Sequence, residues 1–132
     1  MATDYISTKA ADNLRLARSK SILTPSADTY NLINLPKHSF VKDVWLWVKV
    51  AGSSDTVSIG WTGNGETAQA AGFLSTDIAN ATVVGLKRAQ HDTMVSFEGK
   101  YFFDAGGQLT MTVGTTQTTG EFHVLVNYTI LH

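Results

Sequence analysis

The amino-acid sequence predicts an all-β protein, built as an antiparallel β-sandwich that carries an N-terminal arm. The first observation is residues 40–50, where apolar and polar side chains alternate with a period of two. The second is that short stretches of the same kind recur along the chain, separated by turns rich in Gly, Asp and Ser. A half-buried strand cannot hide its apolar face alone, so these strands must form two packed layers.

Residues 40–50 are the strongest strand signal and organise the rest of the chain. The even positions are apolar except for Lys42, and they comprise Phe40, Val44, Leu46, Val48 and Val50. Asp43 and Lys49 mark the odd positions as the wetter face. We therefore expect the even positions to point into the core.

Residues 1–20 are polar and are predicted to form an arm outside a β-sandwich domain at 21–132. Leu14 and Ala17 would share one face of a helix over residues 10–18, so the arm is expected to be either a short helix or extended. Its cations Arg15, Arg18 and Lys20 are candidates for contact with a neighbouring molecule.

The remaining strands are expected wherever β-branched and aromatic residues alternate with polar ones. These segments are 21–24, 29–35, 57–61, 81–86, 94–103, 108–113 and 121–131. Residues 52–55 resemble a turn, so 57–61 is expected to return as the hairpin partner of 40–50. Residues 66–79 are rich in small side chains and stay open between a loop and a short helix.

Composition excludes several classes of function. With 132 residues the chain is expected to form one domain with a substantial core, and it has no cysteine for disulfides or thiolate metal sites. With a net charge of -1, the chain has no excess of positive charge to attract nucleic acid, which is not expected as a partner. No apolar run approaches the roughly 20 residues of a membrane span, and the first twenty residues do not resemble a signal peptide. We expect synthesis in the cytoplasm and no membrane partner.

No motif for catalysis is visible. The histidines are scattered and lack the close spacing of a shared metal site; they are His38, His91, His123 and His132. No serine lies in a Gly-x-Ser-x-Gly elbow. We therefore expect neither an enzyme nor a metal or other cofactor.

Trp45 and Trp47 lie on the more polar, odd face of the 40–50 strand. Either an N-terminal segment or the second sheet covers them, or they form an exposed aromatic ridge. An exposed ridge would become buried in a subunit contact or would stack on sugar rings. Because aromatic residues are enriched at protein interfaces, a subunit contact is the favoured role for such a ridge.

Several segments, in this order, resemble small structural proteins of tailed bacteriophages that decorate or reinforce the capsid shell. They are 28–36 (DTYNLINLP), 40–48 (FVKDVWLWV), 57–60 (VSIG), 72–74 (GFL) with Asp77, 106–113 (GGQLTMTV) and 124–128 (VLVNY). The resemblance covers residues 21–132 and implies a jelly-roll-like sandwich. It also implies a non-enzymatic virion protein on the capsid surface, with the major capsid protein as partner and a homo-oligomer such as a trimer.

In that context five residues are candidates for capsid or subunit contacts: Arg15, Arg18, Lys20, Trp45 and Trp47. Two alternatives stay open. The chain could be a carbohydrate-binding module with Trp45, Trp47 or Trp61 as its stacking platform, or a tail or head-fibre component of the virion.

Overall fold

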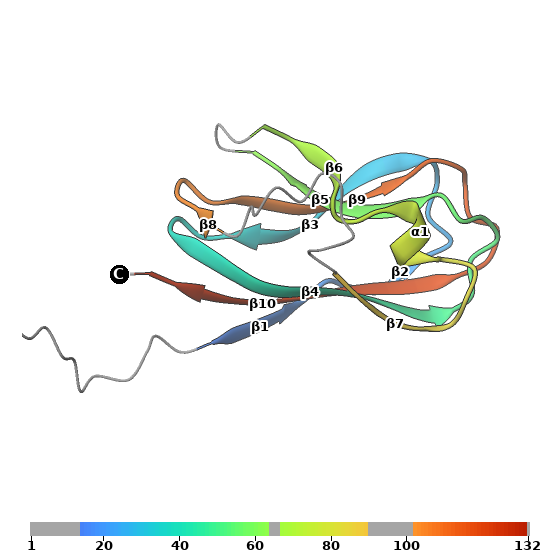
Figure 1. The fold of residues 1–132 in the computed structure, drawn as a ribbon. Helices are drawn as coiled ribbons and strands as arrows, with labels where there is room; N and C mark the ends of the chain where they lie inside the picture. Colours follow the sequence, from blue (N-terminus) through green and yellow to red (C-terminus); the bar gives the residue numbers. More distant parts are fainter. Residues whose placement is uncertain (1–13, 64–66, 90–101, 132) are drawn as a thin grey trace, which may run out of the picture.

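The computed structural model describes residues 14–63, 67–89 and 102–131. Its strands are β1 (Arg15–Arg18), β2 (Ile22–Leu23), β3 (Asp28–Leu35), β4 (Ser39–Val50), β5 (Val57–Thr62), β6 (Gln69–Leu74), β7 (Gly85–Arg88), β8 (Phe102–Phe103), β9 (Gly107–Val113) and β10 (Glu121–Ile130). One short helix, α1 (Thr76–Ala79), lies between β6 and β7. The strands form two packed layers, as Figure 1 shows, so the predicted all-β sandwich is confirmed.

Each layer is an antiparallel sheet. Sheet A has the order β1-β10-β4-β7, with β2 also paired to β10 and β8 also paired to β4. Sheet B has the order β3-β9-β5-β6. Strand β4 is central to sheet A, and its longest partner is the final strand β10.

The even positions of β4, which were expected to point into the core, do so only in the middle of the strand. Leu46 and its neighbours Val44 and Val48 are buried, as expected. The pairing with β10 skips Lys42, so Val41 is buried in place of Phe40. A second register shift skips Lys49 and leaves Val50 exposed. Each β-bulge inserts one residue and thereby reverses the phase of the alternation beyond it.

The expected hairpin between β4 and β5 is wrong. Strand β4 belongs to sheet A, whereas β5 belongs to sheet B and pairs with β9 and β6. The connection at 51–56 is a crossover between the layers, anchored where the Gly52 N–H donates to the Ala81 carbonyl. Alternation reports which residues share a face, and it carries no information on which strand lies alongside.

The open segment 66–79 contains both β6 and α1. Ser75 caps the N-terminus of α1, and Asn80 in the left-handed conformation ends it. The strand expected at 81–86 begins only at Gly85, because residues after α1 form a turn. The Lys87 ammonium group donates hydrogen bonds to the carbonyl of Ala79, at the end of α1, and to those of Asn80 and Val83 in that turn.

The strands expected from the sequence agree with the observed strands to different degrees. Strands β2, β3, β9 and β10 lie where they were expected. Most of the strand expected at 94–103 lies outside the described residues, which include only its end as β8. Within the predicted arm, Arg15–Arg18 is extended rather than helical, because the edge of β10 supplies its backbone partners.

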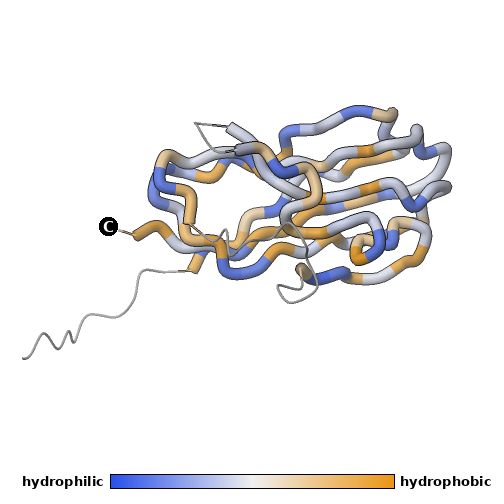
Figure 2. Tube along the Cα trace, turned by 45° about the horizontal axis from the view of Figure 1, so that its top comes forward, coloured by the Kyte–Doolittle hydropathy of each residue, from blue (hydrophilic) through white to orange (hydrophobic). Residues whose placement is uncertain are grey.

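The core fills the space between the sheets. Hydrophobic and hydrophilic residues alternate along the strands in Figure 2, as expected for a two-layer sandwich with one wet side per sheet. Three of its aromatic rings pack together: Trp61 packs edge-on against Phe73, with ring centroids 4.9 Å apart, and against Phe103 at 5.9 Å. Because Trp61 and Phe73 belong to sheet B and Phe103 to sheet A, these contacts join the two layers.

Candidate interaction surface

The side of sheet A that faces away from sheet B is the candidate site, and we call it the outer face of sheet A. In Figure 1 this side of β1, β10, β4 and β7 lies at the bottom, and no other described strand or helix covers it. Residues on it alternate with the buried residues of the same strands. The face is therefore available for contact within the part of the chain that the structure describes.

The strand register arranges the outer face in rows. One row runs Arg18, Leu125, Trp45, Arg88, and the next runs His123, Trp47, Leu86. Further along the strands lie the row Leu16, Asn127, Asp43 and the row Thr129, Phe40, Phe102. Residues opposite each other on antiparallel strands have Cβ atoms about 5 Å apart, so each row is a continuous surface.

Trp45 and Trp47 are half-buried on this face, so the second sheet does not cover them. The Trp47 ring packs against the His123 ring, with centroids 4.9 Å apart, and the Lys49 ammonium lies 5.6 Å from its centroid. These contacts hold Trp47 in one orientation. A rigid, partly exposed aromatic ring loses little conformational entropy on binding, which suits it to an interface.

Trp61 is not on the surface at all. It is 4% exposed in the core, and its indole N–H donates to the Thr67 carbonyl. A ring enclosed by other side chains cannot stack on a sugar. The alternative role of Trp61 as a stacking platform is therefore wrong, because its place in β5 turns it toward sheet A.

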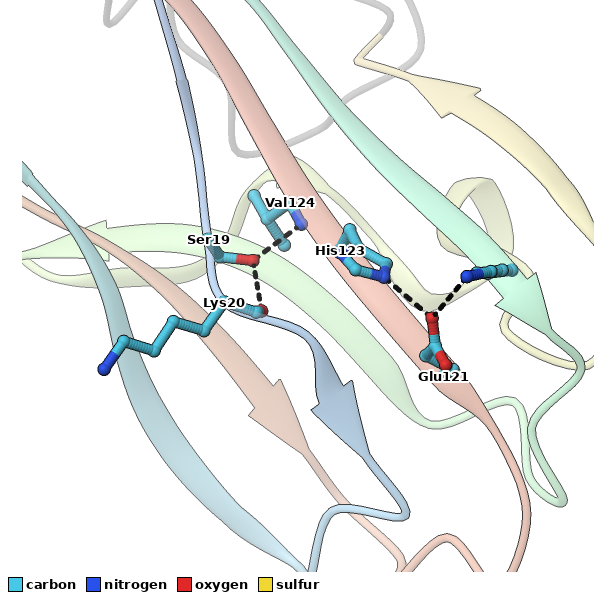
Figure 3. Close-up of polar contacts among 6 residues, drawn as sticks. Ser19, Lys20, Glu121, His123 and Val124 are labelled. Carbon is cyan, nitrogen blue, oxygen red and sulfur yellow. Dashed lines mark hydrogen bonds and ion pairs between the residues drawn. The ribbon is translucent and has the colours of Figure 1, made fainter.

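Two ion pairs neutralise the carboxylates of the outer face. Arg88 donates from Nε and Nη2 to one oxygen of Asp43, at 2.9 and 2.6 Å. Glu121 lies 3.4 Å from Lys49 and 2.9 Å from Nε2 of His123, as Figure 3 shows for the histidine. The hydrogen bond from His123 lowers the pKa of Glu121, with Lys49 adding to the effect and partial desolvation opposing it.

His123 is the site residue that the sequence did not single out. Its side chain is buried under Trp47, and its Nδ1 atom has no hydrogen-bond partner in the described part of the chain. A hydrogen on Nε2 satisfies Glu121 and leaves Nδ1 as an acceptor, which is cheaper to bury unpaired than a donor on a charged ring. The spacing Glu-x-His on one face of β10 was the available signal.

Two cations of the predicted arm, Arg18 and Lys20, lie along one edge of the outer face, whereas Arg15 lies opposite the buried Tyr128 and therefore on the other side of β1. Arg18 is opposite Leu125, and Lys20 follows at the break between β1 and β2. None of Arg15, Arg18 and Lys20 forms an ion pair with another described residue. Within the described residues, these charges are therefore without a counter-charge.

Ser19 fixes this edge to the sheet. Its backbone N–H donates to the Val124 carbonyl at 2.8 Å, and its hydroxyl accepts from the Val124 N–H at 3.0 Å. The same hydroxyl lies 3.0 Å from the Lys20 carbonyl, to which it donates (Figure 3). The side chain thereby replaces a strand bond at the break, so that Arg18 and Lys20 are held at defined positions.

Large apolar side chains on this face remain exposed. Leu16 near the β1 edge is 67% exposed and Leu86 near the β7 edge is 61% exposed. Trp45, Trp47 and Leu125 lie half-buried between these edges. Exposed apolar side chains gathered on one face are common at interaction sites, which makes this face the candidate site.

No protein-family model and no curated protein matches the chain. Three solved structures do. The chain matches a chain of the cyanophage Pam1 capsid asymmetric unit with a TM-score of 0.66 and 17% identity, over 99% of this chain and 94% of that one. It matches a chain of the capsid of Ralstonia phage GP4 with a TM-score of 0.66 and 16% identity, over 99% and 92%.

The third match is to the acid-stable capsid of Helicobacter pylori bacteriophage KHP30, with a TM-score of 0.63 and 19% identity, over 91% and 90% of the two chains. The likeness is one of fold. It extends over nearly the whole of both chains in each case, so the matched chains are of similar length to this one.

Other kinds of site leave no trace in the described residues. No three His, Cys, Asp or Glu side chains among them gather as metal ligands would. None of their helices has the length and apolar content to cross a membrane.

Proposed function

We propose that this chain is a non-enzymatic structural protein of a phage virion, which binds and reinforces the outside of the capsid. The observation that carries the proposal is the likeness, over nine tenths or more of both chains, to chains of similar size in three phage capsid structures. The order of sequence segments that resembles decoration proteins supports it independently. The partner is the major capsid protein, and the location is the capsid surface after synthesis in the host cytoplasm.

The mechanism is mechanical. Copies of a rigid sandwich that bridge neighbouring shell subunits bind the assembled state only, so each contact stabilises the shell by mass action. An interface of standard size needs about 800 Å² per partner, which one face of a small sheet can supply. A symmetric oligomer such as a trimer would multiply these contacts.

The number of copies in the virion tests the proposal. Quantitative mass spectrometry of purified virions from the source should give a fixed simple ratio of this protein to the major capsid protein. A handful of copies per particle would place the protein in the tail or in a fibre instead.

Absence from particles would refute a virion role. A glycan array would then test the carbohydrate-binding alternative, for which Trp45 and Trp47 are the remaining half-exposed rings. Glycan binding that Trp47→Ala abolishes in a folded protein would support that alternative.

A further inference from the structure

We propose that the outer face of sheet A is the surface that docks on the capsid shell. We further propose that the shell presents to it an apolar protein surface flanked by carboxylates on the side that meets β1. This inference rests on the proposed function and adds which face binds, and to what chemistry.

The first argument is the apolar content of the face. It combines exposed leucines with half-buried tryptophans in adjacent rows, where Leu86 is directly opposite Trp47 and Leu125 is directly opposite Trp45. Exposure of these apolar side chains to water is unfavourable in free energy, and burial against an apolar partner surface removes that exposure. Aromatic residues at the centre of a patch are the usual anchors of protein interfaces.

The second argument is that the central charges need no partner. Asp43 is bonded by Arg88, and Glu121 is bonded by His123 and lies beside Lys49. When an apolar surface covers these groups, each buried charge keeps the counter-charge that it already has within the chain. The centre of the face therefore fits an uncharged partner surface.

The third argument concerns the edges and distinguishes the shell from a second copy of this chain. On this face the β1 edge carries Arg18 and Lys20, which have no ion-pair partner among the described residues, and Arg88 on the opposite β7 edge is already paired with Asp43. Two copies packed face to face with β1 on β1 would bring like charges together. With β1 on β7 they would offer Arg18 and Lys20 no unpaired carboxylate. The carboxylates that could form ion pairs with these cations are Asp43 and Glu121, and both are already paired within the chain. Complementarity therefore requires a different partner with carboxylates beside β1.

Nucleic acid is the other anionic partner that aromatic rings and cations could attract. Phosphate chains need unpaired cations along a groove. On this face the unpaired cations of the described residues are confined to the β1 edge, since Arg88 and Lys49 are engaged with carboxylates. The exposed leucines Leu16 and Leu86 have no role in stacking on bases. These features favour a protein surface.

Binding of the full-length protein to shells tests the docking face. The probe is capsids of the source phage assembled without this protein and treated with nuclease, and the assay is co-sedimentation over a range of salt concentrations. Leu86→Asp and Arg18→Glu are expected to weaken binding at least about tenfold each. For Arg18→Glu the salt dependence should also become flatter, because one attractive pair is lost.

Two matched controls carry the same changes in charge away from this face. Asn31→Asp adds a negative charge on the exposed side of β3 in sheet B, and Lys37→Glu reverses a charge in the exposed turn after β3. Both should bind like the wild type. Thermal melting of all four variants checks that each is folded, which exposed positions should permit.

The outcomes separate the docking face from the proposed function. If wild-type protein binds but Leu86→Asp and Arg18→Glu bind equally well, another face docks and this inference is overturned alone. If wild-type protein does not bind the shells, the decoration role and the docking face both fall. Loss of an oligomer in Leu86→Asp, measured by sedimentation, would assign the face to contacts between copies. Binding to untreated shells that is lost on nuclease-treated shells would assign it to nucleic acid.

Discussion

Gln117 lies in the loop between β9 and β10, and its side chain ties together the two crossovers at one end of the sandwich. It is fully buried, with 1% of its surface exposed. Its Oε1 accepts from the N–H groups of Ser53 and Ser54 at 2.8 and 3.0 Å, and its Nε2 donates to the carbonyls of Ser54 at 2.8 Å and Thr115 at 3.3 Å. One amide thus holds the loop at 51–56 against the loop at 114–120.

Replacing Gln117 with Ala leaves two N–H groups and two carbonyls without their partner. Each buried group left unsatisfied costs about 1–3 kcal/mol, although water can reach those near the exposed Ser53 and the partly exposed Ser54. We therefore expect a loss of about 2–4 kcal/mol in the free energy of unfolding. This corresponds to a fall in Tm of roughly 4 °C for each kcal/mol in a domain of this size.

Urea unfolding followed by tryptophan fluorescence measures the loss. Gln117→Glu keeps the acceptor for Ser53 and Ser54 but places a buried carboxylate oxygen against the carbonyls of Ser54 and Thr115, so its loss at pH 7 should be at least as large as that of Gln117→Ala. Thr119→Ala is the matched control, because it removes one exposed hydrogen bond, to the Ala51 carbonyl, from the same loop. Its cost should be about 1 kcal/mol or less. A Gln117→Ala variant as stable as Thr119→Ala would refute the reasoning.

Three further predictions address acid stability, packing and the arm. The folded-state pKa of Glu121 is lowered, so the carboxylate contributes stability above the ordinary Glu pKa, and this contribution is lost as pH falls through the folded-state pKa. The Tm of wild type should therefore exceed that of Glu121→Gln by less at pH 3 than at pH 6. A Tm difference that does not change with pH would contradict this. In Gly72→Ala the new Cβ would lie 2.1 Å from the Trp61 ring, so urea unfolding should show a loss of about 1–3 kcal/mol; an unchanged midpoint would show that the ring moves freely. The fragment 21–132 should fold but melt below 14–132, because it lacks β1 and the bonds of Ser19 to Val124; equal melting temperatures would show that the edge contributes nothing.

The outer face of sheet A illustrates how far the sequence leads toward a site. Alternation put Trp45 and Trp47 together on the wetter side of β4, and the structure places both there. It could not show that Leu86 lies opposite Trp47, because the two are separated by a crossover and meet only through register. The same holds for His123, whose place under Trp47 follows from pairing between β4 and β10.

The sequence by itself determined the strand content of this protein, since a period of two and the turn residues between strands are local properties of the chain. It also determined which residues of the middle of β4 and of β10 enter the core. Only the tertiary structure decided that β4 and β5 lie in different sheets, and that bulges at Lys42 and Lys49 reverse the alternation at both ends of β4. Strand partners and register depend on contacts between residues far apart in the chain, whose free energy comes from the packing of the whole sandwich rather than from any one segment.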